Sequence, residues 1–230
     1  VRPMERFGQG FGYILYRKTL HAAPAGELAM DEVHDFARVY LNGGLAGTLD
    51  RREPDHSALK LLAIAEGTRL DVLVADDGRI NHTHEMRGEN KGITHSVSLN
   101  GAPLKGWQVY LLPLGEPGTG LLPKRFTETR IDGPAFYRAT FTLDKVGDIF
   151  LDIRKLGKGA LWINGHAIGR FWNVGPQDTL YVPGPWLKKG LNTIVVFDLL
   201  NTANSSPSIE GLPTPILDGP TPDRTTSSQQ

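Results

Sequence analysis

Gly159-Ala160-Leu161-Trp162-Ile163-Asn164-Gly165-His166-Ala167-Ile168-Gly169-Arg170-Phe171-Trp172 is the stretch of this chain that decides its fold. Leu161 and Ile163 alternate with their neighbours, as in a strand whose side chains leave opposite faces. Asn164-Gly165 follows at once, and this dipeptide best tolerates the positive φ angles of a tight hairpin turn. The chain then returns through a second apolar stretch. These features predict a β-hairpin rather than a helix.

An earlier stretch repeats this pattern. Ala37-Arg38-Val39-Tyr40-Leu41-Asn42-Gly43-Gly44-Leu45-Ala46-Gly47 has the same alternation, the same Asn-Gly turn and the same later glycine. Asn164 lies 122 residues after Asn42, and Gly169 lies 122 residues after Gly47. Flanking blocks repeat at nearly this offset, namely Tyr16-Arg17 with Tyr137-Arg138 and Gly67–Val74 with Gly190–Phe197. Two copies are too few for a solenoid, so the sequence predicts one β-domain present twice.

The rest of the chain is predicted to form short strands separated by turns. Many strands with almost no helix predict an all-β protein of two tandem antiparallel β-sandwich domains. We place the first domain at 1–115, the second at 116–205, and a Pro/Ser/Thr-rich, partly disordered tail at 206–230, with Pro213–Asp218 as an edge strand. The expected strands are Phe11–Leu20, part of Leu28–Phe36, the first hairpin, Leu59–Ile64, Leu70–Val74, Ile93–Leu99, Trp107–Leu114, Ala135–Leu143, Ile149–Ile153, Gly159–Asn164, Ala167–Phe171, Thr179–Val182 and Asn192–Leu199.

The composition excludes several classes of function. Lysine plus arginine balance aspartate plus glutamate, 25 against 25, and no basic run with interleaved aromatics points to nucleic acid. Cysteine is absent, which excludes disulfides and thiolate chemistry. No apolar run approaches the ~20 residues that span a bilayer, so no membrane partner is expected. The opening Val1-Arg2-Pro3-Met4 is no signal peptide and suggests a cut or processed fragment.

Several motifs together carry a family resemblance. They are Gly12–Arg17, Asp77–Asn81, Lys91–Thr94, Gly106–Gln108, Leu111–Leu114, Lys158–Gly165 and Asn173–Pro183. They resemble β-galactosidases of glycoside hydrolase family 35, over nearly all of residues 4–200. The similarity is confined to the region after the catalytic barrel. It therefore implies two jelly-roll, galactose-binding-domain-like β-sandwiches.

The resemblance also bears on activity. In that family two glutamates at strand ends of a (β/α)₈ barrel perform the reaction, and retaining chemistry needs their carboxyls ~5 Å apart. The Asn-Glu dipeptide of the family's acid/base does not occur here. We therefore expect no enzyme activity from the chain on its own. The resemblance implies a region that braces the barrel of a secreted or periplasmic parent enzyme. The alternative is an autonomous module that binds galactosides or plant polysaccharide.

Aromatic and polar residues near the second hairpin are candidates for sugar binding. An aromatic plane buries the apolar C–H face of a pyranose while neighbouring polar groups bond its hydroxyls. Arg170, Trp172, Asn173 and His166 form the most sugar-like cluster, and Trp162 is a further stacking candidate, as are Trp107, Trp186 and Tyr181. The competing interpretation is that the tryptophans belong to the core or to domain packing.

The segment Asn81-His82 is the second candidate. The resemblance implies that this loop reaches the barrel's sugar pocket, although the family often has tyrosine where His82 stands; the alternative is an ordinary loop residue. His82, His84 and Glu85 form only a weak metal motif. No cofactor is expected, and the family's jelly rolls point to structural calcium if any ion binds. Arg51–Glu53 and Arg87–Lys91 are expected to be solvated loops.

Overall fold

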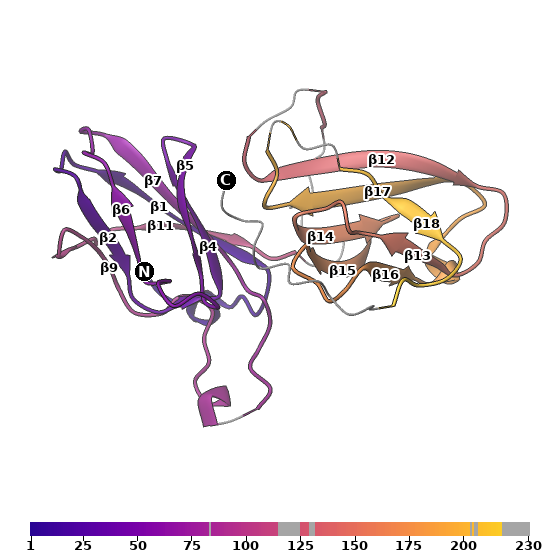
Figure 1. The fold of residues 1–230 in the computed structure, drawn as a ribbon, viewed down its shortest axis with the longest axis horizontal. Coiled ribbons are helices and arrows are strands. Elements are labelled where there is room, and N and C mark those ends of the chain that lie inside the picture. Colours follow the sequence, from indigo (N-terminus) through magenta and orange to yellow (C-terminus); the bar gives the residue numbers. More distant parts are fainter. Residues whose placement is uncertain (83, 115–124, 129–131, 203, 205–206, 218–230) are drawn as a thin grey trace. The chain divides into compact units, whose positions relative to one another are not determined.

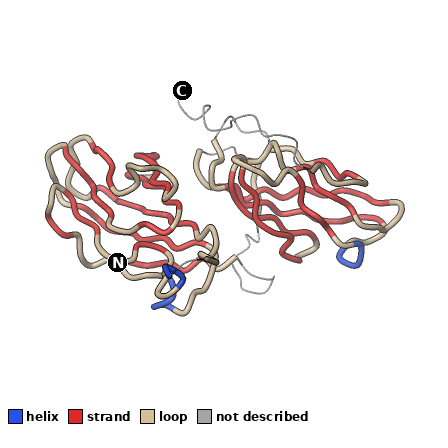
Figure 2. Tube along the Cα trace, turned by 60° about the horizontal axis from the view of Figure 1, so that its bottom comes forward, coloured by secondary structure: helices blue, strands red, loops and turns tan. Residues whose placement is uncertain are grey.

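The computed structural model describes residues 1–82, 84–114, 125–128, 132–202, 204 and 207–217. The chain forms two compact units, Val1–Leu114 and Gly115–Gln230. Figure 2 shows strands throughout both, with helix confined to short turns. No described helix has the length and apolar character needed to cross a membrane. The predicted boundary at 115/116 lies outside the described residues.

The first unit is a sandwich of two antiparallel sheets (Figure 1). Its strands are β1 (Tyr13–Leu20), β2 (Gly26–Met30), β3 (Val33–His34), β4 (Phe36–Leu41), β5 (Gly44–Asp50), β6 (Ala58–Leu61), β7 (Thr68–Ala75), β8 (Gly92–Ile93), β9 (Val97–Leu99), β10 (Ala102–Pro103) and β11 (Gln108–Leu112). One sheet has the order β11-β1-β7-β4-β5 and the other β10-β9-β2-β6, while β3 pairs with β8. The alternate, inward residues of both sheets form the core, among them Ile14, Tyr16, Leu28, Val72 and Leu99.

The second unit is a smaller sandwich of the same kind. Its strands are β12 (Ala135–Leu143), β13 (Ile149–Asp152), β14 (Lys158–Ile163), β15 (His166–Trp172), β16 (Thr179–Val182), β17 (Gly190–Asp198) and β18 (Glu210–Leu212). They form the sheets β12-β17-β14-β15 and β16-β13-β18. The core between them contains Leu151, Leu161, Ile163, Phe171 and Val196. The prediction of an all-β chain of β-sandwiches is confirmed.

The internal repeat extends to the topology and the turns. The order β1-β7-β4-β5 in the first unit matches β12-β17-β14-β15 in the second. Both hairpins close on the predicted Asn-Gly turn, with φ of 51° and 90° at Asn42-Gly43 and 48° and 92° at Asn164-Gly165. Positive φ at both central residues is the type I′ geometry. The side-chain oxygen of each asparagine accepts the backbone N–H of the next long strand, at Arg69 (2.8 Å) and Thr193 (3.0 Å).

A one-residue bulge occupies the same place in both hairpins. The register shifts between Val39 and Tyr40 in one and between Leu161 and Trp162 in the other. The extra residues on the returning strands are Ala46 and Ile168, since neither has a partner in the register. A bulge of this kind moves every following side chain to the other face of the sheet.

The glycine beside each bulge lets the two sheets approach. A Cβ atom at Gly47 would lie 2.8 Å from Leu59 Cδ2 of β6, and one at Gly169 would lie 3.2 Å from Leu180 Cδ2 of β16. β6 and β16 occupy matching places in the facing sheets of the two units. A leucine therefore packs over a glycine at equivalent positions in both copies.

Two predicted strands differ from the structure. Ile93–Leu99 is not one strand, because β8 and β9 lie in different sheets. The predicted edge strand at Pro213–Asp218 is wrong over the described residues to Leu217: the edge strand is β18, which pairs with β13. Pro213 and Pro215 have no N–H to donate to a ladder, so pairing ends before them. Residues 218–230 of the predicted tail lie outside the described residues.

Candidate functional site

The bulge divides the cluster predicted on the second hairpin. Trp172 lies opposite Lys158, whereas His166 lies opposite Ile163, a fully buried core residue. Directly opposed residues of an antiparallel pair share a face. His166 is therefore on the core face of the sheet, and Arg170 and Trp172 are on the other. Even spacing in the sequence suggests one row, but Ile168 is the extra residue that breaks it.

His166 belongs to the hairpin tip. Its ring stacks on Trp186 at 4.9 Å between centroids and 12° between planes. Trp186 lies in the short helix η3 (Gly184–Trp186), and its carbonyl accepts a hydrogen bond of 2.8 Å from Asn164 Nδ2. The turn asparagine thus fixes η3 against the tip, and His166 packs there rather than beside Trp172.

Trp162 is buried on the face of β14 opposite to Leu161 and Ile163, so its prediction as a sugar contact is wrong. Only 1% of its surface is exposed. Its ring centroid lies 6.4 Å from that of Phe136, which in turn lies 4.8 Å from Phe197. An indole enclosed in this way cannot stack on a ligand from solvent.

Trp172, Arg170 and Asn173 remain together at the other end of β15. Lys158 Nζ lies 3.1 Å from the centre of the half-buried Trp172 ring, although Lys158 itself is buried. A desolvated ammonium on an aromatic face is a strong cation–π contact. Arg170 and Asn173 are exposed, and Asn173 N donates to Gly157 O at 2.7 Å. The indole is therefore held in a fixed orientation beside two surface polar groups.

The second candidate is the loop between β7 and β8. Figure 1 shows this loop, with its short helix η2 (His84–Met86), projecting beyond the ends of the strands. Asn81 and His82 are exposed on it. Within the described part of the chain, no three His, Asp or Glu side chains are placed to hold a metal ion. The structural calcium remains a prediction.

Buried charges hold the base of this loop. Lys91, 1% exposed, donates through Nζ to Asp35 Oδ2 and Glu89 Oε1, both at 2.8 Å. Arg51 Nη1 bridges the same two carboxylates, at 3.0 Å from Asp35 Oδ1 and 2.7 Å from Glu89 Oε1. We call Lys91, Arg51, Asp35 and Glu89 the ion cluster. The prediction of solvated loops at Arg51–Glu53 and Arg87–Lys91 is wrong for its members.

Further contacts attach both ends of the loop to the sandwich. Asp77 N donates to Asp35 Oδ2 at 2.9 Å at the start of the loop. Arg79 donates to Glu89 O at 2.9 Å and forms a 2.5 Å ion pair with Glu5. These contacts join the loop ends to Asp35, just before β4, and to Glu5 of the N-terminal segment, and they leave Asn81 and His82 exposed.

The two carboxylates of the ion cluster are not arranged for glycoside hydrolysis. Burial opposes ionisation of Glu89, but hydrogen bonds from Arg51 and Lys91 outweigh it and lower the pKa of its carboxyl. A catalytic acid needs the opposite, a raised pKa that keeps its proton near neutral pH. Both carboxylates are also paired with the buried Lys91 and the partly buried Arg51. The cluster is a structural device.

The lowered pKa of Glu89 predicts an acid-labile first unit. Its folded pKa lies below the unfolded value of about 4.3, so its contribution to stability is complete above that pH and lost as pH falls through the folded pKa. Urea unfolding between pH 7 and pH 3 is expected to show a smaller loss of stability in Glu89→Gln than in the parent chain. Glu53→Gln, at an exposed position, is the control. Equal losses in the parent and Glu89→Gln would contradict the assignment.

Comparison with known proteins identifies both units. Residues 2–113 match the family model described as "Beta-galactosidase, first all-beta domain", and residues 134–192 match "Beta-galactosidase, galactose-binding domain". The β-galactosidase of Xanthomonas manihotis is 40% identical over 181 residues, which cover 79% of this chain and 30% of that protein. β-Galactosidase-1-like protein 2 of Homo sapiens is 32% identical over 219 residues, which cover 91% of this chain and 32% of that protein. The chain spans about a third of the length of these relatives.

Among solved structures, a putative β-galactosidase from Bacteroides fragilis matches with a TM-score of 0.30 and 15% identity, covering 88% of this chain and 33% of that one.

Proposed function

This chain belongs to the β-galactosidase family, because it contains that family's first all-β domain and galactose-binding domain. On that basis we propose that it is a non-catalytic β-domain region, which braces the catalytic barrel of a β-galactosidase-like glycoside hydrolase. The observation that carries the proposal is the pair of domain matches, together with the third of the relatives' length that the chain spans. The catalytic barrel is its proposed partner.

The loop with Asn81 and His82 is the proposed contact with the barrel's sugar pocket. The ion cluster supports this role, because a loop that lines a pocket must keep its position when substrate binds. Four buried or partly buried charged side chains fix its base, while its end is exposed. His82 would then offer a hydrogen-bonding ring towards the pocket.

Hydrolysis by the isolated chain is not expected. A nitrophenyl β-galactoside incubated with it should release no more nitrophenol than buffer alone, because the chain matches only the first all-β domain and the galactose-binding domain of the family. Turnover that survives repurification would overturn the non-catalytic role. The bracing role has a positive test: a separately produced catalytic barrel of a family member should unfold at a higher temperature when the chain is added. An unchanged unfolding temperature would count against bracing.

Carbohydrate binding by the second unit is the second candidate. Residues 134–192 match the galactose-binding domain, and this range includes Trp172, Arg170 and Asn173. The Lys158 contact fixes the indole plane, so little side-chain entropy would be lost when a galactoside stacks on it. Arg170 and Asn173 would bond the sugar hydroxyls. His166 lies on the other face of the sheet and has no part in this proposal.

Titration calorimetry against galactose, lactose and β-galactans tests this candidate. Millimolar or tighter binding is expected, weakened at least about tenfold in Trp172→Ala because the stacking surface is lost. Leu191→Ala is the matched control, since Leu191 is an exposed apolar residue of the same unit and is not among the sugar-binding candidates. Absence of heat in a chain that circular dichroism shows to be folded would remove this candidate and leave bracing alone.

A further inference from the structure

The smaller sheet of the second unit carries a row of three large side chains across its strands. The row is Leu212 of β18, Phe150 of β13 and Tyr181 of β16, with Phe150 directly opposite each of the other two. Figure 1 shows these three strands side by side. Directly opposed residues of antiparallel strands share a face, so the three side chains leave the sheet on the same side.

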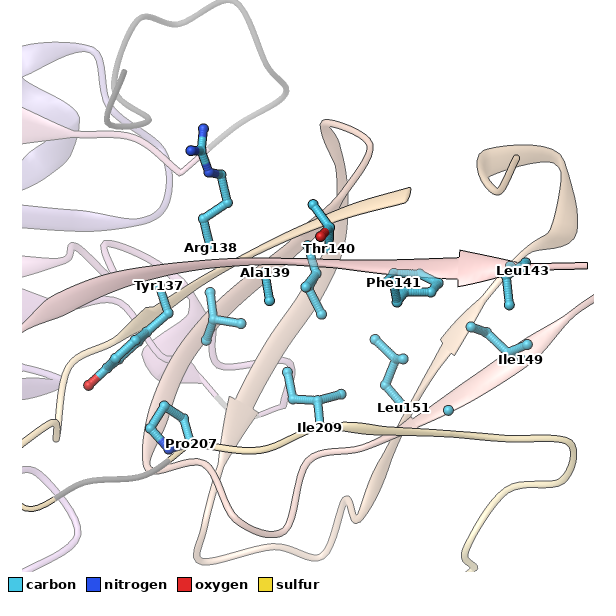
Figure 3. Close-up of a pocket in the computed structure, with 13 residues that line it drawn as sticks. Tyr137, Arg138, Ala139, Thr140, Phe141, Leu143, Ile149, Leu151, Pro207 and Ile209 are labelled. Atoms are coloured by element: carbon cyan, nitrogen blue, oxygen red, sulfur yellow. The ribbon is translucent and has the colours of Figure 1, made fainter. Parts of the chain in front are cut away.

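This row is on the outer face of the sheet, away from the core. Ile149 and Leu151, the chain neighbours of Phe150, line the cavity between the two sheets, and Figure 3 shows both side chains toward β12. Side chains alternate along a strand, so Phe150 faces the other way. Tyr181 likewise alternates with two core residues of β16, and 49% of it is exposed.

The two aromatic rings of the row are held in a fixed arrangement. The ring centroids of Phe150 and Tyr181 lie 5.5 Å apart, and the planes are tilted by 46°. Hydrogen bonds from Gly184 N, at 2.8 Å, and from the Tyr181 hydroxyl lower the pKa of the Asp148 carboxyl. Tyr181 is thus held at its ring by Phe150 and at its hydroxyl by Asp148. A side chain fixed in this way loses little entropy when a ligand stacks on it.

A second row, of polar residues, runs beside the first. Asp152 of β13 lies directly opposite Glu210 of β18 and Thr179 of β16. Arg154 holds the Asp152 carboxylate through two hydrogen bonds, Nε to Oδ1 at 3.0 Å and Nη2 to Oδ2 at 2.7 Å. The rows are two positions apart on every strand, which is about 7 Å. The face therefore offers an apolar stripe with hydrogen-bonding groups next to it.

The charges of this face select among classes of ligand. The carboxylates of Asp148, Asp152 and Glu210 lie beside the aromatic pair, and they repel phosphates and other anions. Charged side chains are depleted at the centre of protein interfaces, so a protein partner fits poorly. A neutral sugar fits both rows, since its C–H face stacks on the rings while its hydroxyls donate to carboxylates. The tilt between the rings suits a chain that winds along its axis.

We propose that this face binds a neutral polysaccharide chain, with successive sugar rings on Tyr181 and Phe150. Asp152 and Glu210 accept hydrogen bonds from the sugar hydroxyls. The row crosses three strands, which is about 10 Å and longer than one pyranose ring, so the ligand is a chain and not a single sugar. The site lies in the other sheet from Trp172 of β15. The choice of β-galactan as the chain rests on the proposed function; the site does not.

Titration calorimetry of a Trp172→Ala chain tests this site without a contribution from the Trp172 cluster. In that background a tetrasaccharide of β-galactan should bind at least about tenfold more tightly than galactose, because galactose covers only part of the row. Circular dichroism checks that the variant is folded. Absence of heat with the tetrasaccharide in a folded chain, or equal affinities for the two sugars, would overturn the proposal.

Variants of Tyr181 locate the binding on the row. Added to Trp172→Ala, Tyr181→Ala should weaken tetrasaccharide binding at least about tenfold, whereas Tyr181→Phe keeps the ring and should retain most of the affinity. Leu191→Ala, at an exposed position of the other sheet, should leave binding unchanged. Equal binding with and without Tyr181→Ala would contradict the site. A dimer of the chain that Tyr181→Ala dissociates would assign the row to a second copy instead.

An oxidised galactan provides the charge control. The same tetrasaccharide with its primary hydroxyls oxidised to carboxylates should bind more weakly, and Glu210→Gln should restore part of the loss. Equal binding of the two forms would contradict a site for neutral ligands. Binding of a β-glucan but not of β-galactan would overturn the choice of chain. Bracing is measured by the unfolding temperature of the barrel, which Tyr181→Ala should not affect, so the two failures are distinguishable.

Discussion

Replacing Lys91 by methionine is expected to lower the free energy of unfolding of the first unit by about 3–5 kcal/mol, because it leaves Asp35 and Glu89 buried without their shared ammonium. Methionine has nearly the same length, so lost packing contributes little. A loss of this size is a large part of the about 5–15 kcal/mol that stabilises an ordinary domain. Scanning calorimetry should show the first unit of the variant melting at a lower temperature than the first unit of the parent chain.

A compensated variant separates charge from packing. Lys91→Met combined with Asp35→Asn and Glu89→Gln removes the charges that methionine leaves unpaired, and it should recover part of the loss. If the triple variant is as unstable as Lys91→Met, the cost lies in the shape of the site and not in its charges. In the loop, Lys91→Met should also accelerate hydrogen exchange near His82.

Replacing Gly159 by alanine is expected to destabilise the second unit by about 3 kcal/mol or more. A Cβ atom there would lie 1.7 Å from Phe197 O and 2.9 Å from Phe171 Cζ. The first contact is with the backbone of β17, so no side-chain rotation can relieve it. β14 must move away from β17, at the centre of the sheet.

Gly147→Ala is the matched control in the same unit. A Cβ atom at Gly147 meets nothing within 4 Å, and this glycine is not among those with positive φ. The change should leave the unfolding temperature nearly unchanged, with at most a small gain from the lower entropy of the unfolded chain. Equal effects of the two substitutions would show that the cost at Gly159 is not steric.

The sequence predicts most of the framework because the framework depends on local chemistry. Asn42-Gly43 and Asn164-Gly165 both form the expected turns, since few other dipeptides accept positive φ twice. β12 and β16 have the predicted bounds, because alternation and the flanking turns agree there. These signals lie within a few residues of the structure that they specify.

The candidate site was harder to predict because it depends on long-range registration. Ile168 gives no sign in the sequence that it is the extra residue of a bulge, yet it moves His166 off the face of Trp172. Lys91 and Arg51 look like solvated charges until the fold brings them to Asp35. Pairing of residues 56 positions apart in the chain, as in Lys91 and Asp35, leaves no periodic pattern to detect.

The bulge that both hairpins share bears on how the two domains arose. Two separate insertions at the same position of equivalent hairpins require more events than one insertion that was followed by duplication of the domain. One insertion before duplication therefore accounts for the extra residues Ala46 and Ile168 more simply than two separate insertions. The side chains at the two bulge positions differ, whereas the Asn-Gly turn and the leucine that packs over the glycine are present in both copies. The bulge, the Asn-Gly turn and the leucine over the glycine are therefore positions at which the two halves of the chain can be aligned although their sequences otherwise differ.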